Sequence, residues 1–284
     1  MYPAKFDYVR AGSVEEAIAL LGDNEDAKLL AGGHSLIPVM KLRLAQPEML
    51  IDIGRIDGIK GICAGDGKVA IGALTTHSEV ESSSDLPAVL PEAASMIGDP
   101  SVRNRGTVGG NVAHADPASD LPTVFMALNA SFNVTGAGGS RTISADNFFT
   151  GLFETALGEG EVLTSVEVSA EGDNQGSAYA KLFNPASRYA MVGAAASVTM
   201  DNGTVSAASV AIGGLTASAT RCAAVAAALV GTSGDADAVA AAAAAVDGDL
   251  GETIGDMHAS ADYRRAVAPE MVKRALASAI ARAS

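Results

Sequence analysis

Two glycine-rich stretches carry the residues best suited to chemistry. One is the segment 105–111, with the sequence Arg-Gly-Thr-Val-Gly-Gly-Asn. Glycine has no Cβ, so the backbone at Gly109 and Gly110 can adopt positive φ angles and let a ligand come close. Thr107 and Asn111 add side-chain donors and acceptors. A glycine turn that directs backbone N–H groups toward an anion binds phosphate, so the segment is a candidate phosphate site; an ordinary Gly-Gly loop is the alternative.

The other stretch, residues 29–38, has the sequence Leu-Leu-Ala-Gly-Gly-His-Ser-Leu-Ile-Pro. This pattern predicts the end of a strand, a glycine turn and a new helix, with Ser35 as N-cap and Pro38 in the first turn. The backbone N–H groups from Gly32 to Leu36 would then point outward without partners in the helix. Two such anion sites far apart in the sequence suit a diphosphate that is held from both sides.

Other cofactor and metal motifs do not occur in the sequence. In residues 136–141, Gly-Ala-Gly-Gly-Ser-Arg, an arginine stands where a dinucleotide-binding Gly-x-Gly-x-x-Gly motif needs its last glycine. Residues 65–69, Gly-Asp-Gly-Lys-Val, lack the spacing and the Ser or Thr of a P-loop. Two cysteines are too few for an iron–sulfur cluster, which needs about four thiolates. Neither a metal site nor a catalytic residue is predicted.

The histidines are interpreted from their neighbours in the sequence. His34 lies inside a glycine-rich stretch, so we expect it to line the ligand site but not to act as a general base. His114 follows the other stretch, and a position beside the ligand is left open for it. His77 and His258 have no such neighbours, and surface positions are favoured for both.

Composition restricts the partners and the location of the protein. The chain has 284 residues, 48% of them hydrophobic, which is enough for a sizeable core and two domains. The net charge of −14 argues against nucleic acid and against an anionic membrane surface as partners. No transmembrane segment is expected, because the apolar runs are too short to span a bilayer. Two isolated cysteines and an N-terminus unlike a signal peptide favour the cytoplasm.

The order of predicted elements divides the chain into three parts. Helices at 13–21 and 35–44 alternate with strands at 28–31 and 49–53, which predicts a β-α-β unit with a parallel sheet. The central part combines hairpins with helices and predicts a mostly antiparallel sheet. Its expected elements are a hairpin around 64–68, a helix capped by Thr76, helices at 86–97 and 118–128, a hairpin at 131–144 and a strand at 162–169.

The helix at 118–128 is expected to begin at Asp116-Pro117, with Asp116 as N-cap and Pro117 at the first helical position. The polar, glycine-rich residues 171–176 are the best domain boundary. Beyond them the sequence predicts strands at 190–200 and 204–213, joined by an Asn-Gly turn, and then alanine-rich helices. These helices are expected at 220–230, 235–246 and 260–283, with a kink or restart at Pro269.

Three motifs together resemble the FAD-binding (medium) subunit of molybdenum hydroxylases, and carbon monoxide dehydrogenase medium subunits are the most similar branch. They are Ala-Gly-Gly-His-Ser-Leu at 31–36, Thr-Val-Gly-Gly-Asn at 107–111 and Asp-Pro-Ala-Ser-Asp at 116–120. The resemblance runs nearly end to end. It implies an α+β, two-subdomain FAD-binding fold of the PCMH (vanillyl-alcohol-oxidase) type, followed by a C-terminal α+β domain with an antiparallel sheet and helices.

The expected domains are an FAD-binding domain at 1–173 and a C-terminal flavoprotein domain at 174–284 with a three-stranded sheet and helices. The FAD-binding domain divides into a small β-α-β subdomain at 1–54 and a mostly antiparallel subdomain at 55–173.

The resemblance implies FAD as the cofactor and assigns residues to it. Residues 31–35 and 107–111 would hold the diphosphate from opposite sides, and Asp120 would accept a hydrogen bond from sugar or ribityl hydroxyls. Lys181 would reach the edge of the flavin ring, and Tyr189 would cover part of that ring or lie on an edge strand. The complete expected set is Leu30, Ala31, Gly32, Gly33, His34, Ser35, Leu36, Ile97, Thr107, Val108, Gly109, Gly110, Asn111, Asp120, Leu163, Lys181 and Tyr189.

The implied function is electron transfer within a heteromeric molybdenum hydroxylase, with an aerobic carbon monoxide dehydrogenase as the first choice. An iron–sulfur small subunit with [2Fe–2S] clusters would deliver electrons, a large subunit would hold the molybdenum cofactor, and a quinone or another carrier would accept electrons. A dimer of heterotrimers is expected, and peripheral association with the inner face of the membrane is left open. The alternatives are a stand-alone flavin oxidoreductase of the same fold, the flavoprotein subunit of a xanthine, aldehyde or N-heterocycle hydroxylase, and a non-catalytic nucleotide-binding module.

Overall fold

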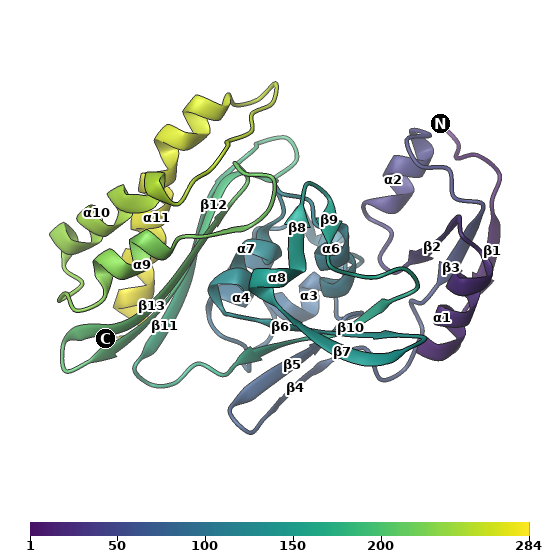
Figure 1. Cartoon of the computed structure of the whole chain (residues 1–284), viewed down its shortest axis with the longest axis horizontal. Helices are drawn as coiled ribbons and strands as arrows, with labels where there is room; N and C mark the ends of the chain where they lie inside the picture. The colour runs from purple at the N-terminus through teal and green to yellow at the C-terminus, as the bar shows by residue number, and fades with distance from the viewer. Residues whose placement is uncertain (284) are drawn as a thin grey trace.

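The structure is a computed structural model that describes residues 1–283. Figure 1 shows three parts in a row, which follow one another in the sequence: an N-terminal subdomain, a central subdomain and a C-terminal domain. Each part has its own hydrophobic core. The overall arrangement therefore agrees with the α+β organisation that the sequence predicts.

The N-terminal subdomain is a small parallel sheet with two helices. The strand order is β1-β3-β2; the pair β2–β3 is parallel, as predicted, and β1, which was not predicted, also pairs with β3 in parallel. The Ser13 side chain caps the first helix by accepting a hydrogen bond from the Glu16 N–H. Ser35 is the N-cap residue of α2, as predicted, but its side chain makes no capping hydrogen bond. The elements are β1 (Asp7–Arg10), α1 (Val14–Asp23), β2 (Ala27–Leu30), α2 (Leu36–Lys41) and β3 (Met49–Asp52).

The central subdomain is built on an antiparallel sheet with the strand order β4-β5-β10-β6-β7. Three phenylalanines, Phe125, Phe132 and Phe148, are fully buried in its core. Its strands are β4 (Ile62–Gly65), β5 (Lys68–Gly72), β6 (Ser131–Gly136), β7 (Gly139–Ser144), β8 (Phe149–Gly151), β9 (Glu154–Thr155) and β10 (Val162–Ser169). Its helices are α3 (His77–Glu81), α4 (Val89–Ser95), α5 (Pro100–Arg103), α6 (Val108–His114), α7 (Asp120–Ala127) and α8 (Ala145–Phe148).

Two details of the central subdomain differ from the predictions. The Thr-Val-Gly-Gly-Asn segment is not an open glycine loop, because Thr107 caps α6 and the glycines lie in the first turn of that helix. Asp116 does not cap α7: its carboxylate accepts a hydrogen bond from the Ala118 N–H, and α7 begins only at Asp120. Thr76 does cap α3, in a reciprocal arrangement with Glu79, as predicted.

The C-terminal domain has a four-stranded sheet, β11-β12-β13-β14, so the predicted three-stranded sheet is one short strand too small. Its longest helix continues through Pro269 without the predicted restart. The elements are β11 (Gln175–Phe183), β12 (Ala190–Asp201), β13 (Thr204–Gly213), β14 (Thr220–Arg221), α9 (Ala223–Leu229), α10 (Ala236–Ala244), the 3₁₀ helix η1 (Ala245–Gly248) and α11 (Ala261–Ala283). In residues 1–283, no helix combines the length and the apolar character that crossing a membrane requires.

The C-terminal domain is fixed against the central subdomain by close packing and by one carboxylate. Helix α7 packs against β12 and β13. The Glu92 carboxylate of α4 accepts a hydrogen bond from the Tyr179 N–H of β11 at 2.8 Å. It also pairs with Arg282 near the end of α11, with both N–O distances at 2.9 Å. A single side chain of the central subdomain thus holds both a strand and a helix of the C-terminal domain.

The packing of α11 on β11 depends on Gly176. A Cβ atom at this position would lie 2.2 Å from the carbonyl oxygen of Ala279, a backbone atom that cannot rotate away. We expect Gly176→Ala to lower the free energy of unfolding by about 1–3 kcal/mol, the usual cost of overpacking. Urea unfolding measures this change. Gly248→Ala is the matched control, because nothing lies within 4 Å of a Cβ atom at position 248. If both variants had the same free energy of unfolding, the close packing of α11 on Gly176 would be contradicted.

Candidate cofactor site

A cleft of about 600 Å³ brings all three parts of the chain together. Its walls come from the first glycine segment (residues 31–36) and the second glycine segment (residues 105–111). Further wall residues belong to the start of α3, to the start of β10 and to residues 187–189 of the C-terminal domain. The two segments that the sequence predicts as opposite sides of a binding site therefore border the same cleft.

The two glycine segments touch through their backbones. A Cβ atom at Gly32 would lie only 2.2 Å from the carbonyl oxygen of Arg105. A Cβ atom at Gly110 would lie 3.9 Å from the methyl group of Ala31. Glycine at position 32 is therefore required by the approach of the second segment, and not by the local turn alone.

The first glycine segment presents free backbone donors. Gly33 has a φ of 73°, which turns the chain after β2. The first hydrogen bond of the following turn runs from the Ile37 N–H to the Gly33 carbonyl oxygen at 3.1 Å. Within residues 1–283, the backbone N–H groups of residues 32–35 donate to no protein group. Because these residues line the cleft, their N–H groups are available to an anion.

Most backbone donors of the second glycine segment are instead used by the protein, and among its N–H groups only that of Thr107 has no acceptor in residues 1–283. Val108 and Gly109 donate to carbonyl oxygens in the segment 73–75, at 2.9 and 2.8 Å. Gly110 donates to the Oγ1 atom of Thr107 at 3.2 Å. The prediction that the two segments offer similar sets of free N–H groups is therefore wrong, because the first turn of α6 is already capped.

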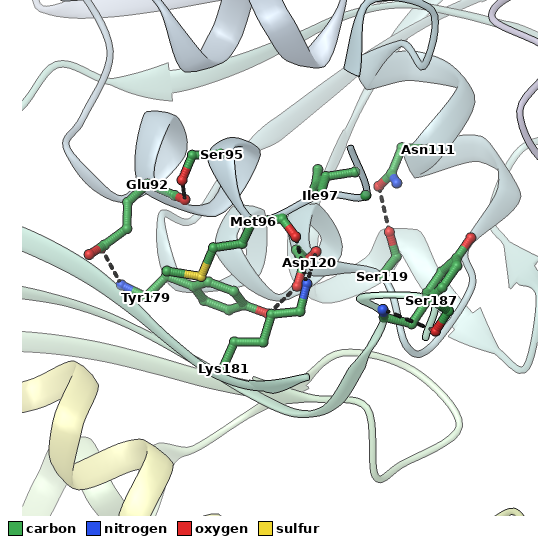
Figure 2. A network of polar contacts seen from close by, with 12 residues as sticks. Glu92, Ser95, Met96, Ile97, Asn111, Ser119, Asp120, Tyr179, Lys181 and Ser187 are labelled. Atoms are coloured by element: carbon green, nitrogen blue, oxygen red, sulfur yellow. Dashed lines mark hydrogen bonds and ion pairs between the residues drawn. The ribbon is translucent and has the colours of Figure 1, made fainter. Parts of the chain in front are cut away.

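Asn111 gives the second segment a side-chain donor. Its Oδ1 atom accepts a hydrogen bond from the Ser119 hydroxyl at 2.9 Å, as Figure 2 shows. The amide nitrogen of Asn111 has no acceptor among residues 1–283. Both residues line the cleft, so the fixed amide can donate to a bound ligand.

A buried ion pair borders the cleft and joins it to the C-terminal domain (Figure 2). Asp120 accepts hydrogen bonds from the Lys181 ammonium at 2.8 Å and from the Tyr179 hydroxyl at 2.6 Å. Lys181 also donates to the carbonyl oxygen of Met96 at 3.2 Å. Burial raises the pKa of Asp120 and lowers the pKa of Lys181, while the attraction between the two groups opposes both shifts.

The ion pair gives Lys181 a position that differs from the prediction. Its side chain is only 1% exposed, and it lies behind Asp120 rather than in the wall of the cleft. The ammonium is directed at the Asp120 carboxylate and at the carbonyl oxygen of Met96. It compensates the charge of Asp120, which is the wall residue of the pair.

Most other residues of the predicted set line the cleft, whereas Val108 is fully buried in the central core. Tyr189 is a wall residue that comes from the C-terminal domain, between β11 and β12. Burial raises its pKa, and the Ser35 side chain of the first glycine segment counteracts this shift in part. The predicted residues found in the wall are Leu30, Ala31, Gly32, Gly33, His34, Ser35, Leu36, Ile97, Thr107, Gly109, Gly110, Asn111, Asp120, Leu163 and Tyr189.

Phe153 and Arg188 also line the cleft, although neither belongs to the expected set. Phe153 lies between β8 and β9, and its ring centroid is 5.2 Å from that of His114. His114, whose role was left open, is thereby placed in the wall. The Arg188 guanidinium lies 5.5 Å from the centre of the Phe183 ring. Arg188 directly precedes Tyr189, a residue of the expected set, in a segment that resembles the family's flavin-proximal segment, whereas Phe153 stands in no motif.

His77 was expected at the surface, but it is 3% exposed and lines the cleft. Burial lowers its pKa to about 4, with smaller contributions from the positive charges of His34 and Arg103. The imidazole is therefore neutral at pH 7. Thr76 as N-cap places His77 at the start of α3, but this position alone does not mark the side chain as buried. His258 is exposed, as expected.

Comparison with known proteins defines the class of the chain. Residues 4–170 match the family described as FAD binding domain in molybdopterin dehydrogenase, and residues 177–279 match the family described as CO dehydrogenase flavoprotein C-terminal domain. The chain therefore belongs to the FAD-binding subunits of molybdenum hydroxylases and is part of an oxidoreductase. The predicted FAD cofactor and the predicted fold class are confirmed.

Individual relatives cover nearly the whole chain. It is 44% identical over 286 residues to the carbon monoxide dehydrogenase medium chain of Hydrogenophaga pseudoflava, and the match covers 99% of both chains. It is 39% identical to the 6-hydroxypseudooxynicotine dehydrogenase complex subunit alpha of Paenarthrobacter nicotinovorans, with 100% and 97% covered. The structure of carbon monoxide dehydrogenase from Hydrogenophaga pseudoflava lacking the Mo-pyranopterin moiety superposes with a TM-score of 0.95 at 45% identity, covering 99% of each chain.

The cleft suits FAD for reasons visible in its geometry. Residues 32–35 offer free N–H groups for a diphosphate, and the backbone contact at Gly32 holds them beside the second glycine segment. The amide nitrogen of Asn111, in the opposite wall, has no acceptor among residues 1–283, which points to a polar neighbour that the protein does not supply.

The contact between Gly32 and Arg105 makes a prediction about FAD binding. In Gly32→Ala, the new methyl group forces the two segments apart, because its neighbour is a backbone carbonyl oxygen. A distortion of about 1–3 kcal/mol at the binding surface corresponds to FAD binding that is weaker by roughly fivefold to a hundredfold. Titration of the FAD-free chain with FAD measures this. Gly22→Ala, where a Cβ meets nothing within 4 Å, is the control; equal affinities would show that the contact does not shape the site.

The depressed pKa of His77 predicts a pH dependence of stability. The unfolded chain takes up a proton near pH 6.5, whereas the folded chain resists protonation at His77 until the pH approaches about 4. Because the unfolded state then binds more protons, the free energy of unfolding falls in this window as the pH is lowered, by up to about 1.4 kcal/mol per pH unit. Urea unfolding of the FAD-free chain measures it. His77→Gln should flatten the slope and His258→Gln should not; the same slope in both would contradict the assignment.

Proposed function

We propose that the chain is the FAD-carrying electron-transfer subunit of a heteromeric molybdenum hydroxylase. It would accept electrons from [2Fe–2S] clusters of a partner subunit and pass them to a quinone or another acceptor. The observation that supports this most directly is the similarity to a carbon monoxide dehydrogenase medium chain over 99% of both chains. FAD supplies the redox chemistry, because a flavin can exchange electrons singly or in pairs.

The asymmetry of the cleft suggests how the diphosphate is held. The free N–H groups of residues 32–35 would donate to its oxygens, and each hydrogen bond to a charged group contributes roughly 1.5–3 kcal/mol. The Asn111 amide would donate from the other side. Several such contacts bind an anion even in a chain whose net charge is −14, because short-range donors act where long-range attraction is lacking.

The remaining wall residues would orient the rest of the cofactor. Asp120 would accept a hydrogen bond from a sugar or ribityl hydroxyl while Lys181 and Tyr179 keep its charge compensated. Ile97 and Leu163 would supply apolar contact, and Tyr189 would cover part of the flavin ring from the C-terminal domain. Lys181 would act on the flavin only through Asp120, and not by direct contact.

The partners proposed are an iron–sulfur small subunit and a large subunit with the molybdenum cofactor, assembled as a dimer of heterotrimers in the cytoplasm. Carbon monoxide is the first choice of substrate, because two carbon monoxide dehydrogenase medium chains are among the relatives, at 44% and 41% identity. A subunit of 6-hydroxypseudooxynicotine dehydrogenase is 39% identical, so a hydroxylase for an N-heterocycle is the second candidate.

Purification of the chain from its native source tests the proposal. We expect FAD, two further chains, iron and molybdenum to co-purify, and we expect carbon monoxide to bleach the flavin absorbance of the complex but not of the isolated FAD-loaded chain. The variant Gly110→Val is purified in the same way. Even a Cβ atom at position 110 would lie 2.8 Å from Thr107 Oγ1, so the valine side chain would not fit in the second glycine segment as it stands. The complex of this variant should keep the metals but lose FAD and electron transfer to a quinone.

Other outcomes of this experiment point to other functions. Bleaching by an N-heterocycle and not by carbon monoxide would identify the second candidate. Turnover of an organic substrate by the isolated FAD-loaded chain would favour a stand-alone flavin oxidoreductase. A colourless chain without flavin in its acid extract would favour a non-catalytic nucleotide-binding module.

A further inference from the structure

His77 is held against the second glycine segment by its own backbone. The His77 N–H donates to the Gly106 carbonyl oxygen at 3.0 Å. A Cβ atom at Gly106 would lie 2.7 Å from Cδ2 and 2.9 Å from Nε2 of the His77 ring. The Cδ2–Nε2 edge of the imidazole therefore packs on the Gly106 backbone, directly before the Thr107 cap of α6. This contact places the ring in the cleft wall beside the segment that faces residues 31–36.

The two ring nitrogens of His77 have different surroundings. Nδ1 is enclosed and has no hydrogen-bond partner in the structure, whereas Nε2 is not among the enclosed, unpartnered atoms. A proton on Nδ1 would be a buried donor without an acceptor, which is costly. A proton on Nε2 can instead be satisfied from the cleft. The neutral ring therefore carries its proton on Nε2 and offers one N–H donor to the cleft.

The second glycine segment needs a donor of this kind. Its N–H groups at Val108, Gly109 and Gly110 are bonded within the protein, and in residues 1–283 only the Thr107 N–H of this turn has no acceptor. This side therefore offers fewer backbone donors to an anion than the first glycine segment, and side chains can add to them. The wall on this side offers the amide of Asn111 and the imidazole of His77, and burial fixes the orientation of the imidazole.

We propose that His77 is a cofactor-contacting residue whose neutral imidazole donates a hydrogen bond from Nε2 to a diphosphate oxygen of FAD. The inference rests on FAD binding in this cleft. His77 adds a donor on the side of the diphosphate where most backbone donors are occupied, and it does so without adding a buried positive charge.

Three variants of the FAD-free chain, titrated with FAD, test the contact. His77→Phe keeps a flat ring but has no donor, so FAD affinity should fall about tenfold to a hundredfold, the range for a hydrogen bond to a charged group. His77→Gln places an amide N–H near the position of Nε2, and its affinity should stay within about threefold of the wild type. His258→Gln, at an exposed site, is the control and should leave the affinity unchanged.

Competing ligands locate the contact on the cofactor. ADP carries the diphosphate, so His77→Phe should weaken ADP by the same factor as FAD, while adenosine should compete equally well against both proteins. Loss of FAD affinity without loss of ADP affinity would place the ring at the flavin and overturn the proposal. Three further results would overturn it. His77→Phe could lose as much affinity for adenosine as for ADP, or it could bind FAD and ADP as tightly as the wild type. His77→Gln could also lose as much FAD affinity as His77→Phe.

Thermal unfolding of each variant separates binding from folding. Should His77→Phe not fold, His77→Asn replaces it, since its shorter amide cannot reach the position of Nε2, and the same difference from His77→Gln is expected. FAD binding by the wild-type chain is established in the same titration. A wild-type chain that binds no FAD would refute the cofactor assignment itself, whereas a wild-type chain that binds FAD with variants that match it would refute only the role of His77.

Discussion

The backbone contact between Gly32 and Arg105 is the constraint on which the cleft depends. The two residues belong to subdomains with separate cores, and the distance of 2.2 Å from a Cβ at position 32 to the Arg105 oxygen leaves room for no side chain. The subdomains therefore meet through main chain, which has no rotamers and fixes their separation. The same contact sets the position of Gly106, and so of the His77 ring that packs on it.

Much of the fold could be predicted because its signals are local. The parallel β-α-β unit, the Asn202-Gly203 hairpin and the cap at Thr76 each depend on a few neighbouring residues. The glycine segments could be found because their composition is unusual within a short window. The fourth strand of the C-terminal sheet, only Thr220–Arg221, was missed because two residues show no alternation pattern.

The site was predicted less completely than the fold because its chemistry depends on distant partners. Nothing near Val108 and Gly109 in the sequence shows that carbonyl oxygens at residues 73–75 occupy their N–H groups. Burial of His77 likewise follows from packing against Gly106, which lies in another segment. Local patterns identify residues that can bind an anion, but only the tertiary structure shows which of their donors remain free.

The Asp120 ion pair explains why the C-terminal domain matters to a cleft that lies mostly outside it. A carboxylate in the wall would repel an anionic cofactor in a chain that already carries a net charge of −14. Strand β11 brings Lys181 and Tyr179 to this carboxylate, and removing one member of a buried pair costs roughly 3–5 kcal/mol. Glu92 in turn holds β11 through the Tyr179 N–H and α11 through Arg282. The charge balance of the cleft wall therefore depends on how the C-terminal domain packs against the central subdomain. A change at the contact between these two parts would act on a cofactor in the cleft without contacting it.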